Sequence, residues 1–292
     1  MEDWRTQGGS HIAVADVRHH SRFEEAKALL IDGLAGLYAS DRRLRSLIEY
    51  ERGVTFMLVA SLDALRDPED ATGGVAMQVL NDILPNMGIT PGRRLTDVVG
   101  LLRRDGLLQA VPSPQDGRAL LLQATPRGIA ADSEWIAVFH APLTVLRPEV
   151  DYGPALACDR EFQRAFRLAG LRTLDIANEI MSANPPMDYF VQESVGFRVL
   201  MLLMQAIRES AENRAPAGFY SDAARKGGMS RTHVKNVLKG AAERGFVTLS
   251  AHPDAYVQLP EVMVGAFDRW VAESLSSIDR VRSMAMQPAA PD

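Results

Sequence analysis

The stretch DAARKGGMSRTHVKNVLKGAAERGFVTL, residues 222–249, decides the fold. It predicts a short helix over 222–226, a tight turn that contains Gly228, and a second helix over 230–244 that ends at a glycine. Ser230 is expected to cap the second helix, because a serine hydroxyl accepts a hydrogen bond from an N–H group of the first turn. The predicted order is therefore short helix, turn, longer helix and short strand.

This order, completed by a second β-like run over 256–259, constitutes a helix-turn-helix followed by a wing and resembles the winged helix-turn-helix of bacterial transcriptional regulators. The apolar residues at helical spacing are expected to face the core: Val234, Val237, Leu238 and Ala241. The opposite face is rich in hydrogen-bond donors that suit phosphates and base edges in the major groove. The predicted DNA-binding residues here are Ser230, Arg231, Thr232, His233, Lys235, Asn236 and Lys239. The alternative interpretation is a solvated polar face on a structural helix.

The distribution of charge bears on a nucleic-acid partner more than the total does. The chain has 292 residues and a formal net charge of −5, which by itself argues against phosphate binding. Residues 225–244 nevertheless contain six basic residues and only one acidic residue, Glu243. Such a segregated basic segment is what a DNA-binding face on an acidic protein needs. Salt screens the electric field of each charged patch beyond roughly 8 to 10 Å, so the acidic remainder does not cancel it.

A weak internal repeat extends outward from this segment. At an offset of 139, Leu95, Val98, Val99 and Leu102 superpose on the four apolar core positions of the second helix, and Gly106 superposes on Gly245. Shared helical periodicity alone is the alternative explanation. The order of predicted elements, however, recurs in both halves, which favours a tandem repeat of one module of about 140 residues.

The predicted elements follow from apolar periodicity and from turn residues. Thr90 and Pro91 are expected to begin the fourth helix as cap and first residue. The predicted closing helix is expected to pack near Trp135 and Phe139. Helices are predicted over 22–38, 54–66, 75–84, 91–105, 159–180, 192–211, 222–226, 230–244 and 262–284, and strands over 107–111, 118–123, 246–250 and 256–259.

Residues 89–130 carry a second resemblance, to the MarR family of repressors. The matching elements are the helix exit Gly106-Leu107-Leu108, the wing Pro114-Gln115-Asp116-Gly117-Arg118 and the closing Thr125-Pro126-Arg127-Gly128. The resemblance implies that Asp116 braces the wing and that Arg118 reaches the minor groove, where narrow A·T-rich stretches attract arginine. It also implies that Arg93, Arg94 and Thr96 face the major groove.

The chain departs from the MarR pattern in three respects. Members of that family are about half as long and form homodimers, whereas here two such modules follow one another in one chain. The second half lacks the Asp-x-Arg wing, and its tip is His252-Pro253-Asp254. Asp97 puts a carboxylate on the presumed DNA face of the first half, where it accepts from cytosine but repels phosphate. The two halves are therefore not expected to contribute equally.

The expected fold is mainly α with small β-hairpin wings, in which two tandem winged helix-turn-helix modules are joined by long packing helices. The predicted division is a flexible N-terminal arm over 1–20, a first winged-helix half over 21–150, a second over 151–286 and a disordered tail over 287–292.

Other chemistry finds little support in the sequence. The chain lacks the Gly-x-Gly-x-x-Gly, Walker, His-Glu-x-x-His and Gly-x-Ser-x-Gly signatures, so no enzyme, cofactor or metal site is expected. His11 and the pair His19-His20 lie in the predicted arm without supporting ligands. The lone Cys158 forms no intrachain disulfide, which fits a reducing cytosol, with a redox switch as the alternative. Met201 and Met204 are interpreted as core, with an effector pocket as the alternative.

The sequence thus predicts a cytoplasmic regulator of transcription that binds double-stranded DNA. Its recognition helices would enter successive major grooves about 34 Å apart. A small-molecule effector between the helical core and a module is compatible with this scheme. The chain is expected to act as a monomeric pseudo-dimer or as a homodimer, with no membrane segment, because its apolar runs are far shorter than about 20 residues. Two rival hypotheses are a winged-helix module for protein contacts without DNA binding, and an enzyme with a nonstandard site.

Overall fold

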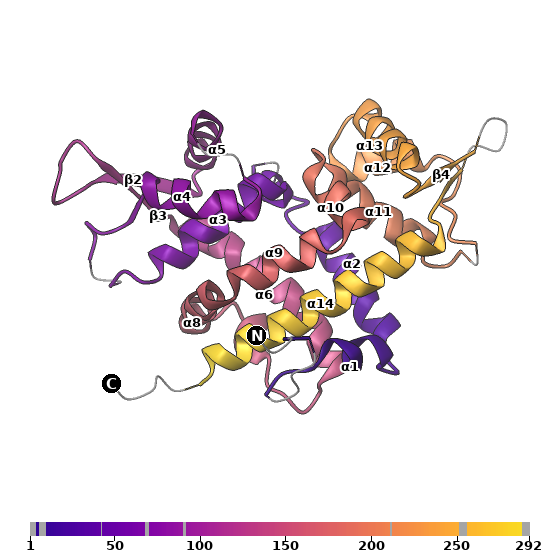
Figure 1. The fold of residues 1–292 in the computed structure, drawn as a ribbon, viewed down its shortest axis with the longest axis horizontal. Helices are drawn as coiled ribbons and strands as arrows, with labels where there is room; N and C mark the ends of the chain where they lie inside the picture. The colour runs from indigo at the N-terminus through magenta and orange to yellow at the C-terminus, as the bar shows by residue number, and fades with distance from the viewer. Residues whose placement is uncertain are drawn as a thin grey trace.

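The computed structural model describes residues 4–5, 10–41, 43–67, 70–89, 92–210, 212–250 and 256–287. Helices dominate, and the strands form two small antiparallel sheets at opposite ends of the molecule (Figure 1). The predicted class, mainly α with small antiparallel sheets, is confirmed.

Each half contributes a similar series of elements. The first half contains α1 (Val14–His19), α2 (Phe23–Gly36), η1 (Leu44–Ile48), α3 (Tyr50–Asp63), β1 (Val75–Ala76), α4 (Met77–Ile83), η2 (Leu84–Met87), α5 (Arg93–Arg104), β2 (Leu108–Pro112), β3 (Leu120–Ala124) and α6 (Pro126–Leu146). The second half contains α7 (Gly153–Leu156), α8 (Arg160–Gly170), η3 (Leu171–Thr173), α9 (Leu174–Ser182), α10 (Pro185–Gln192), α11 (Gly196–Ile207), α12 (Phe219–Gly227), α13 (Arg231–Glu243), β4 (Thr248–Leu249), β5 (Val257–Gln258) and α14 (Glu261–Ala285).

The sheets occupy corresponding places in the two series. In the first, the strand order is β1-β3-β2, and β2 pairs with β3 from Leu108 opposite Ala124 to Pro112 opposite Leu120. In the second, β4 pairs with β5, and an isolated bridge joins Arg214 to Gln258. Arg214 lies 139 residues after Val75, the first residue of β1, so the bridge stands where the first sheet has its third strand.

The long helices are exchanged between the halves in a reciprocal way. Helix α2 of the first half packs against α11 of the second, and α8 of the second packs against α3 of the first. Helix α1 packs against α14 in the same manner as α7 packs against α6. Helices α6 and α14 contact each other where the halves meet, and α14 crosses in front of α6 in Figure 1. Each half therefore completes the helical body of the other.

Two ion pairs repeat this exchange. Asp132 of α6 accepts a hydrogen bond from Arg167 Nε of α8 at 2.9 Å, and Asp268 of α14 accepts one from Lys27 of α2 at 2.8 Å. Asp132 is 1% exposed, and it also accepts a bond from Gln163 at 2.7 Å. A carboxylate buried to this extent requires such partners, because an unpaired charge in a protein interior is strongly disfavoured.

Apolar residues from both halves form one continuous core. Its largest fully buried side chains include Phe56 of α3, Phe190 of α10 and Phe267 of α14. A smaller cluster joins Ile136 of α6, the phenylalanines of α8 and Val281 of α14, with Trp135 packed against it. The predicted packing of the closing helix near Trp135 is confirmed. This packing removes the apolar stripe along α14 from water.

The N-terminal segment differs from the loose arm that the sequence predicts. Over its described residues it packs on α14: the Ile12 N–H donates to Asp279 at 2.8 Å, and Ser276 Oγ donates to the Ile12 carbonyl at 2.8 Å. Trp4 is buried, and its indole donates to Glu179 at 3.1 Å. The physical reason is that α14 offers the buried Asp279 carboxylate and Ser276 hydroxyl to the backbone of Ile12. Of the predicted tail, 288–292 lie outside the described residues.

Several predicted helices differ in extent from those in the structure. The helix expected over 159–180 is divided into α8, η3 and α9, with Thr173 Oγ1 donating to the Gly170 carbonyl at the break. The helix expected over 75–84 begins as strand, because Val75 and Ala76 pair with β3. The first helix is also shorter than predicted, since α2 ends at Gly36. Local apolar periodicity does not reveal such breaks, because they depend on partners distant in sequence.

The helix expected over 192–211 begins later, as α11 at Gly196, and it is preceded by α10, which the sequence did not predict. Val195 between them has φ of +58°, and a Cβ at Gly196 would collide with the Phe190 carbonyl, so the chain turns sharply there. Among the described residues, no single helix has the length and apolar character to cross a membrane; α10 and α11 meet that test only as a pair bent by 118°. Met201 and Met204 of α11 are buried in the core, as predicted.

A buried histidine in the second cluster gives a prediction for pH dependence. His140 is fully buried beside Tyr152, Phe162 and Phe166, and Nδ1 lies 2.7 Å from the Ile136 carbonyl. Burial lowers the pKa of His140 from 6.5 to about 4. As the pH falls below about 6.5, the unfolded chain binds this proton before the folded one does. The contribution of neutral His140 to the free energy of unfolding is thus complete above that pH. About 3 kcal/mol of this free energy is lost as the pH falls toward 4.

Urea unfolding at about pH 7 and about pH 4.5 measures this loss. The variant His140→Leu is expected to lose less stability between the two pH values than the natural chain does, because it carries no proton at this position. Equal losses in the two proteins would contradict the assignment to His140.

Candidate nucleic-acid interface

The turn between α12 and α13 is built as the sequence predicts. Gly228 has φ of +64°, in the left-handed region that favours glycine, and it ends α12. The Ser230 hydroxyl accepts a hydrogen bond from the His233 N–H at 3.1 Å, so the predicted cap is confirmed. The apolar face of α13 is buried, as predicted, by Val234, Val237, Leu238 and Ala241.

The other face of α13 is open to solvent. All seven predicted residues of this segment are exposed: Ser230, Arg231, Thr232, His233, Lys235, Asn236 and Lys239. Within the described part of the chain, Arg231 and Lys235 have no ion-pair partner. Lys239 lies 3.7 Å from Glu243 one turn later, an exposed pair of small energetic value. Arg231 and Lys235 are therefore the two cations of this helix that are free to meet a phosphate.

The neighbouring charges are more balanced than the count over 225–244 suggests. Asp222, just outside that range, pairs with Arg225 and with Lys226 at 2.9 Å. The hydrogen bond from Lys226 and then that from Arg225 lower the pKa of Asp222. Arg244 donates to the Gly240 carbonyl at 2.9 Å and lies over the Tyr189 ring. The positive potential is concentrated on the first two turns of α13.

Helix α5 of the first half presents a different face. Arg93, Arg94 and Thr96 are all exposed, as the MarR resemblance implies. Arg94 is nevertheless held by Glu51 of α3 at 2.6 Å, and Asp97 is exposed beside them. The helix begins at Arg93 after Gly92, whose φ is +86°, whereas the expected cap Thr90 and first residue Pro91 lie outside the described residues.

The β2–β3 hairpin has the brace that the resemblance implies for the first wing. Asp116 Oδ1 accepts a hydrogen bond from the Arg118 N–H at 3.0 Å, and the Asp116 carbonyl accepts one from Ala119 at 2.9 Å. This geometry closes the hairpin tip and leaves the Arg118 side chain exposed. The tip expected for the second wing lies outside the described residues, since 251–255 are not among them.

Helices α5 and α13 lie on the same side of the molecule. Figure 1 shows both at the upper edge, with the β2–β3 hairpin extending from one end and the β4 strand toward the other. The long helices α6, α8 and α14 occupy the opposite side. The two helices that carry most of the candidate residues thus lie on one side of the molecule, one in each half.

The described residues include no group of three or more His, Cys, Asp or Glu side chains that could hold a metal ion. Cys158 is exposed and unpaired among the described residues, next to the start of α8. Sequence reasoning missed one set of side chains near α13, the arginines at 45 and 198. The signal for the latter was present, since Arg198 interrupts the apolar run over 197–204.

No family model, no curated protein and no solved structure shows significant similarity to the chain.

Proposed function

We propose that the chain is a sequence-specific DNA-binding regulator of transcription, in which two winged helix-turn-helix modules are held by long helices so that one chain imitates a MarR dimer. The observation that carries the proposal is the placement of α5 and α13. Each follows a short helix, precedes a hairpin and carries an exposed polar face, and the two helices lie on the same side of the molecule (Figure 1). Two such helices suit successive major grooves on one face of a duplex.

The roles of the side chains follow from their surroundings. Arg231 and Lys235, which lack ion-pair partners within the described residues, would contact phosphates and guanine edges from α13. Arg118 would enter the minor groove from the braced wing. Arg94 has to leave Glu51 before it reaches DNA, so α5 is expected to add less affinity than α13. An asymmetric operator follows from this difference between the modules.

The salt dependence of DNA binding tests the proposal. Each phosphate contact releases counterions and contributes about −0.9 to the slope of log K against log salt. If the two modules together make about six such contacts, affinity is expected to fall by about 1,000-fold between about 50 and about 200 mM salt. Fluorescence anisotropy with labelled genomic fragments measures it. Absence of binding at about 50 mM salt, or binding that does not respond to salt, would overturn the proposal.

The second candidate is a winged-helix protein that binds another protein instead of DNA. The specific observation in its favour is the outer face of α5, where Glu51 holds Arg94 and Asp97 is exposed. Under this alternative the chain shows no salt-dependent DNA binding, and the α5 face is the contact surface. The anisotropy experiment separates the two candidates.

Under this proposal the chain catalyses no reaction and needs no cofactor. It would act in the cytoplasm, where bacterial DNA lies. Light scattering on the chain decides between its two oligomeric forms. A particle of 32.0 kDa corresponds to a monomer that acts as a pseudo-dimer, and twice that mass corresponds to a homodimer with four modules.

A further inference from the structure

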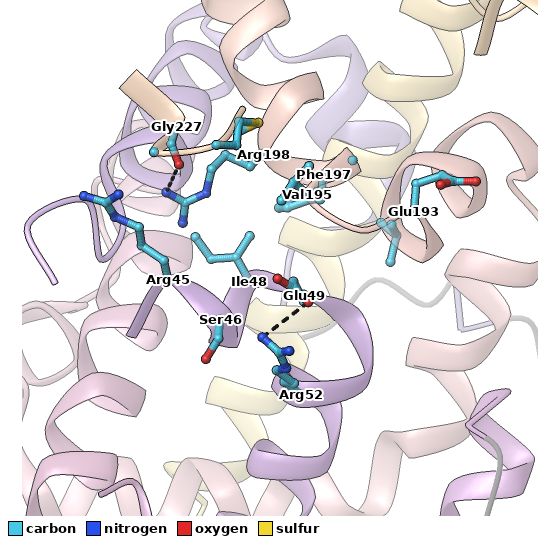
Figure 2. A pocket seen from close by; sticks show the side chains of 14 residues that line it. Arg45, Ser46, Ile48, Glu49, Arg52, Glu193, Val195, Phe197, Arg198 and Gly227 are labelled. Carbon is cyan, nitrogen blue, oxygen red and sulfur yellow. Dashed lines mark hydrogen bonds and ion pairs between the residues drawn. The ribbon is translucent and has the colours of Figure 1, made fainter. Parts of the chain in front are cut away.

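A cavity of about 300 Å³ lies beneath the helix-turn-helix of the second half. It is bounded by η1 of the first half, by the start of α11 and by the turn that follows α12 (Figure 2). Three arginines line it, Arg45, Arg52 and Arg198, together with the acids Glu49 and Glu193. This excess of basic side chains inside a hollow between the halves calls for a physical explanation.

Arg198 is the unusual member of the group. It is only 6% exposed, and its Nη1 donates a long bond of 3.5 Å to the Gly227 carbonyl. Its Nη2 has no hydrogen-bond partner among the described residues. Burial, and then the charge of Arg45, lower the pKa of Arg198 to about 10, so the group remains charged at neutral pH. The charge of Glu49 acts in the opposite direction, but no carboxylate among the described residues forms an ion pair with Arg198. A buried guanidinium without such a partner is strongly disfavoured, and an anion in the cavity would relieve that cost.

The fold itself does not require an arginine at this position. Gly53 of α3 and Gly196 of α11 are equivalent, because a Cβ on either would collide with the carbonyl of a preceding segment, Leu47 or Phe190. Two residues after each glycine stand Thr55 and Arg198, both buried. The first half thus has a threonine at the position that corresponds to Arg198. The arginine is a feature of one half only.

The other charges around the cavity leave room for an anion. Arg52 is paired with Glu49 at 3.4 Å, and Arg45 donates to the Ala39 carbonyl through Nε at 3.1 Å. Figure 2 shows the Glu193 carboxylate turned away from the three arginines. The first turn of α11 opens onto the cavity and has no side-chain cap among the described residues, so its N–H dipoles add positive potential.

Apart from Ser46 and three glycines, the remaining lining is apolar and comes from both halves: Ile48, Val191, Val195, Phe197 and Met229. A bare inorganic ion makes no use of such a surface, whereas a ligand with a hydrocarbon portion does. A volume of about 300 Å³ is at the lower end of the range for small-molecule sites.

We propose that this cavity binds a small organic anion, whose carboxylate or phosphate group pairs with the Arg198 guanidinium and whose apolar part lies against Ile48 and Phe197. Carboxylates and phosphates share the two-oxygen edge that a guanidinium fork binds. Arg45 and the N-terminus of α11 assist from the rim of the site.

The ligand would also act on α13, an effect that rests on the proposed function. A Cβ at Gly228 would collide with the Arg45 guanidinium, and one at Gly227 would lie 3.3 Å from Arg198 Cδ, so both arginines touch the turn before α13. An anion that draws these arginines into the cavity removes support from that turn. Without ligand, α5 and α13 lie on the same side of the molecule. A change in the turn before α13 would alter this arrangement, so binding of the anion is expected to weaken DNA binding.

Calorimetric titration of the full chain with hexanoate, hexyl phosphate, inorganic phosphate and hexan-1-ol tests the site. At least one of the two organic anions is expected to bind with a Kd of about 1 mM or tighter. The two distinguish a carboxylate ligand from a phosphate ligand, while hexan-1-ol and inorganic phosphate should bind at least tenfold more weakly than the tighter organic anion. Equal binding of the alcohol would overturn the proposal, as would the failure of both organic anions to bind.

Variants make the test specific to Arg198. Arg198→Met is expected to lower anion affinity at least tenfold, and Arg198→Lys less, because it keeps the charge. Arg160→Met, an exposed arginine on α8, is the matched control and should leave affinity unchanged. Arg198→Met should be at least as stable to heat as the natural chain, since it removes a buried charge without an ionic partner. A clear loss of stability would mean that Arg198 is structural, and would overturn the proposal.

The effect on DNA is measured separately. Saturating anion is expected to weaken DNA affinity at least fivefold in the natural chain and to have no effect in Arg198→Met. If the anion binds and the chain binds no DNA, the proposed function fails and the ligand site stands. If DNA binds and the anion leaves its affinity unchanged, the coupling through the Gly227-Gly228 turn is wrong.

Discussion

The double variant Arg231→Ala/Lys235→Ala is expected to bind DNA about 100-fold more weakly than the natural chain. Both side chains are exposed on the first two turns of α13 and lack ion-pair partners within the described residues, so they are the cations most available to DNA. A bidentate arginine contact to guanine contributes about 1–3 kcal/mol, and each lost phosphate contact reduces the salt slope by about one. Fluorescence anisotropy across a salt series measures both effects.

The control for this experiment has the same change of charge on the opposite side of the molecule. Arg160→Ala/Arg172→Ala removes two exposed arginines from α8 and η3, and should change DNA affinity less than threefold. Thermal unfolding of both variants should match that of the natural chain, because exposed side chains away from special features contribute little to stability. Equal losses of DNA affinity in the two double variants would mean that α13 has no special role.

The largest expected change in stability comes from Asp132→Ala. This substitution leaves Arg167, which is 9% exposed, without its carboxylate partner at the contact between α6 and α8. Removing one member of a buried ion pair typically costs about 3–5 kcal/mol, because the remaining charge stays buried. Denaturant unfolding is expected to show a loss of this size, and Gln163 loses a hydrogen-bond acceptor as well.

The pseudo-equivalent pair supplies the matched control. Asp268→Ala removes the partner of Lys27, but Lys27 keeps Glu24 at 2.8 Å, so a loss of no more than about 1 kcal/mol is expected. The double change Asp132→Leu/Arg167→Met should recover most of the stability lost in Asp132→Ala, since an apolar pair replaces the ionic one. If Asp132→Ala and Asp268→Ala lose equal stability, the two contacts do not differ as their burial indicates.

Features set by local chemistry were accessible from the sequence. The Ser230 cap, the buried stripe of α13 and the Asp116 brace each depend on residues a few positions apart, and the structure agrees with all three. The breaks at η3 and before α11 were missed, because apolar spacing continues across them while the backbone turns. Strand β1 was missed because its two residues form strand only through pairing with β3.

The sequence was sufficient to predict which residues of the site are exposed. It was not sufficient to predict which of their charges are neutralised by ion pairs. That Glu51 holds Arg94 depends on the distance between α3 and α5, which no spacing rule supplies. Asp222 lay outside the basic segment by sequence and beside it in space. The cavity around Arg198 was inaccessible for the same reason, since η1 and α11 meet there from different halves.

The exchange of helices between the halves has a consequence for synthesis on the ribosome. Asp32 of α2 bonds with Gln205 at 2.8 Å and with Arg208 at 2.9 Å, partners that lie 173 and 176 positions later in the chain. When the first half leaves the ribosome, the surfaces of α2 and α3 that α11 and α8 will cover are still exposed to water. Contacts of such long range close slowly, and exposed apolar surface favours aggregation meanwhile. The nascent first half is therefore expected to be the stage of synthesis at which this protein is most prone to aggregate.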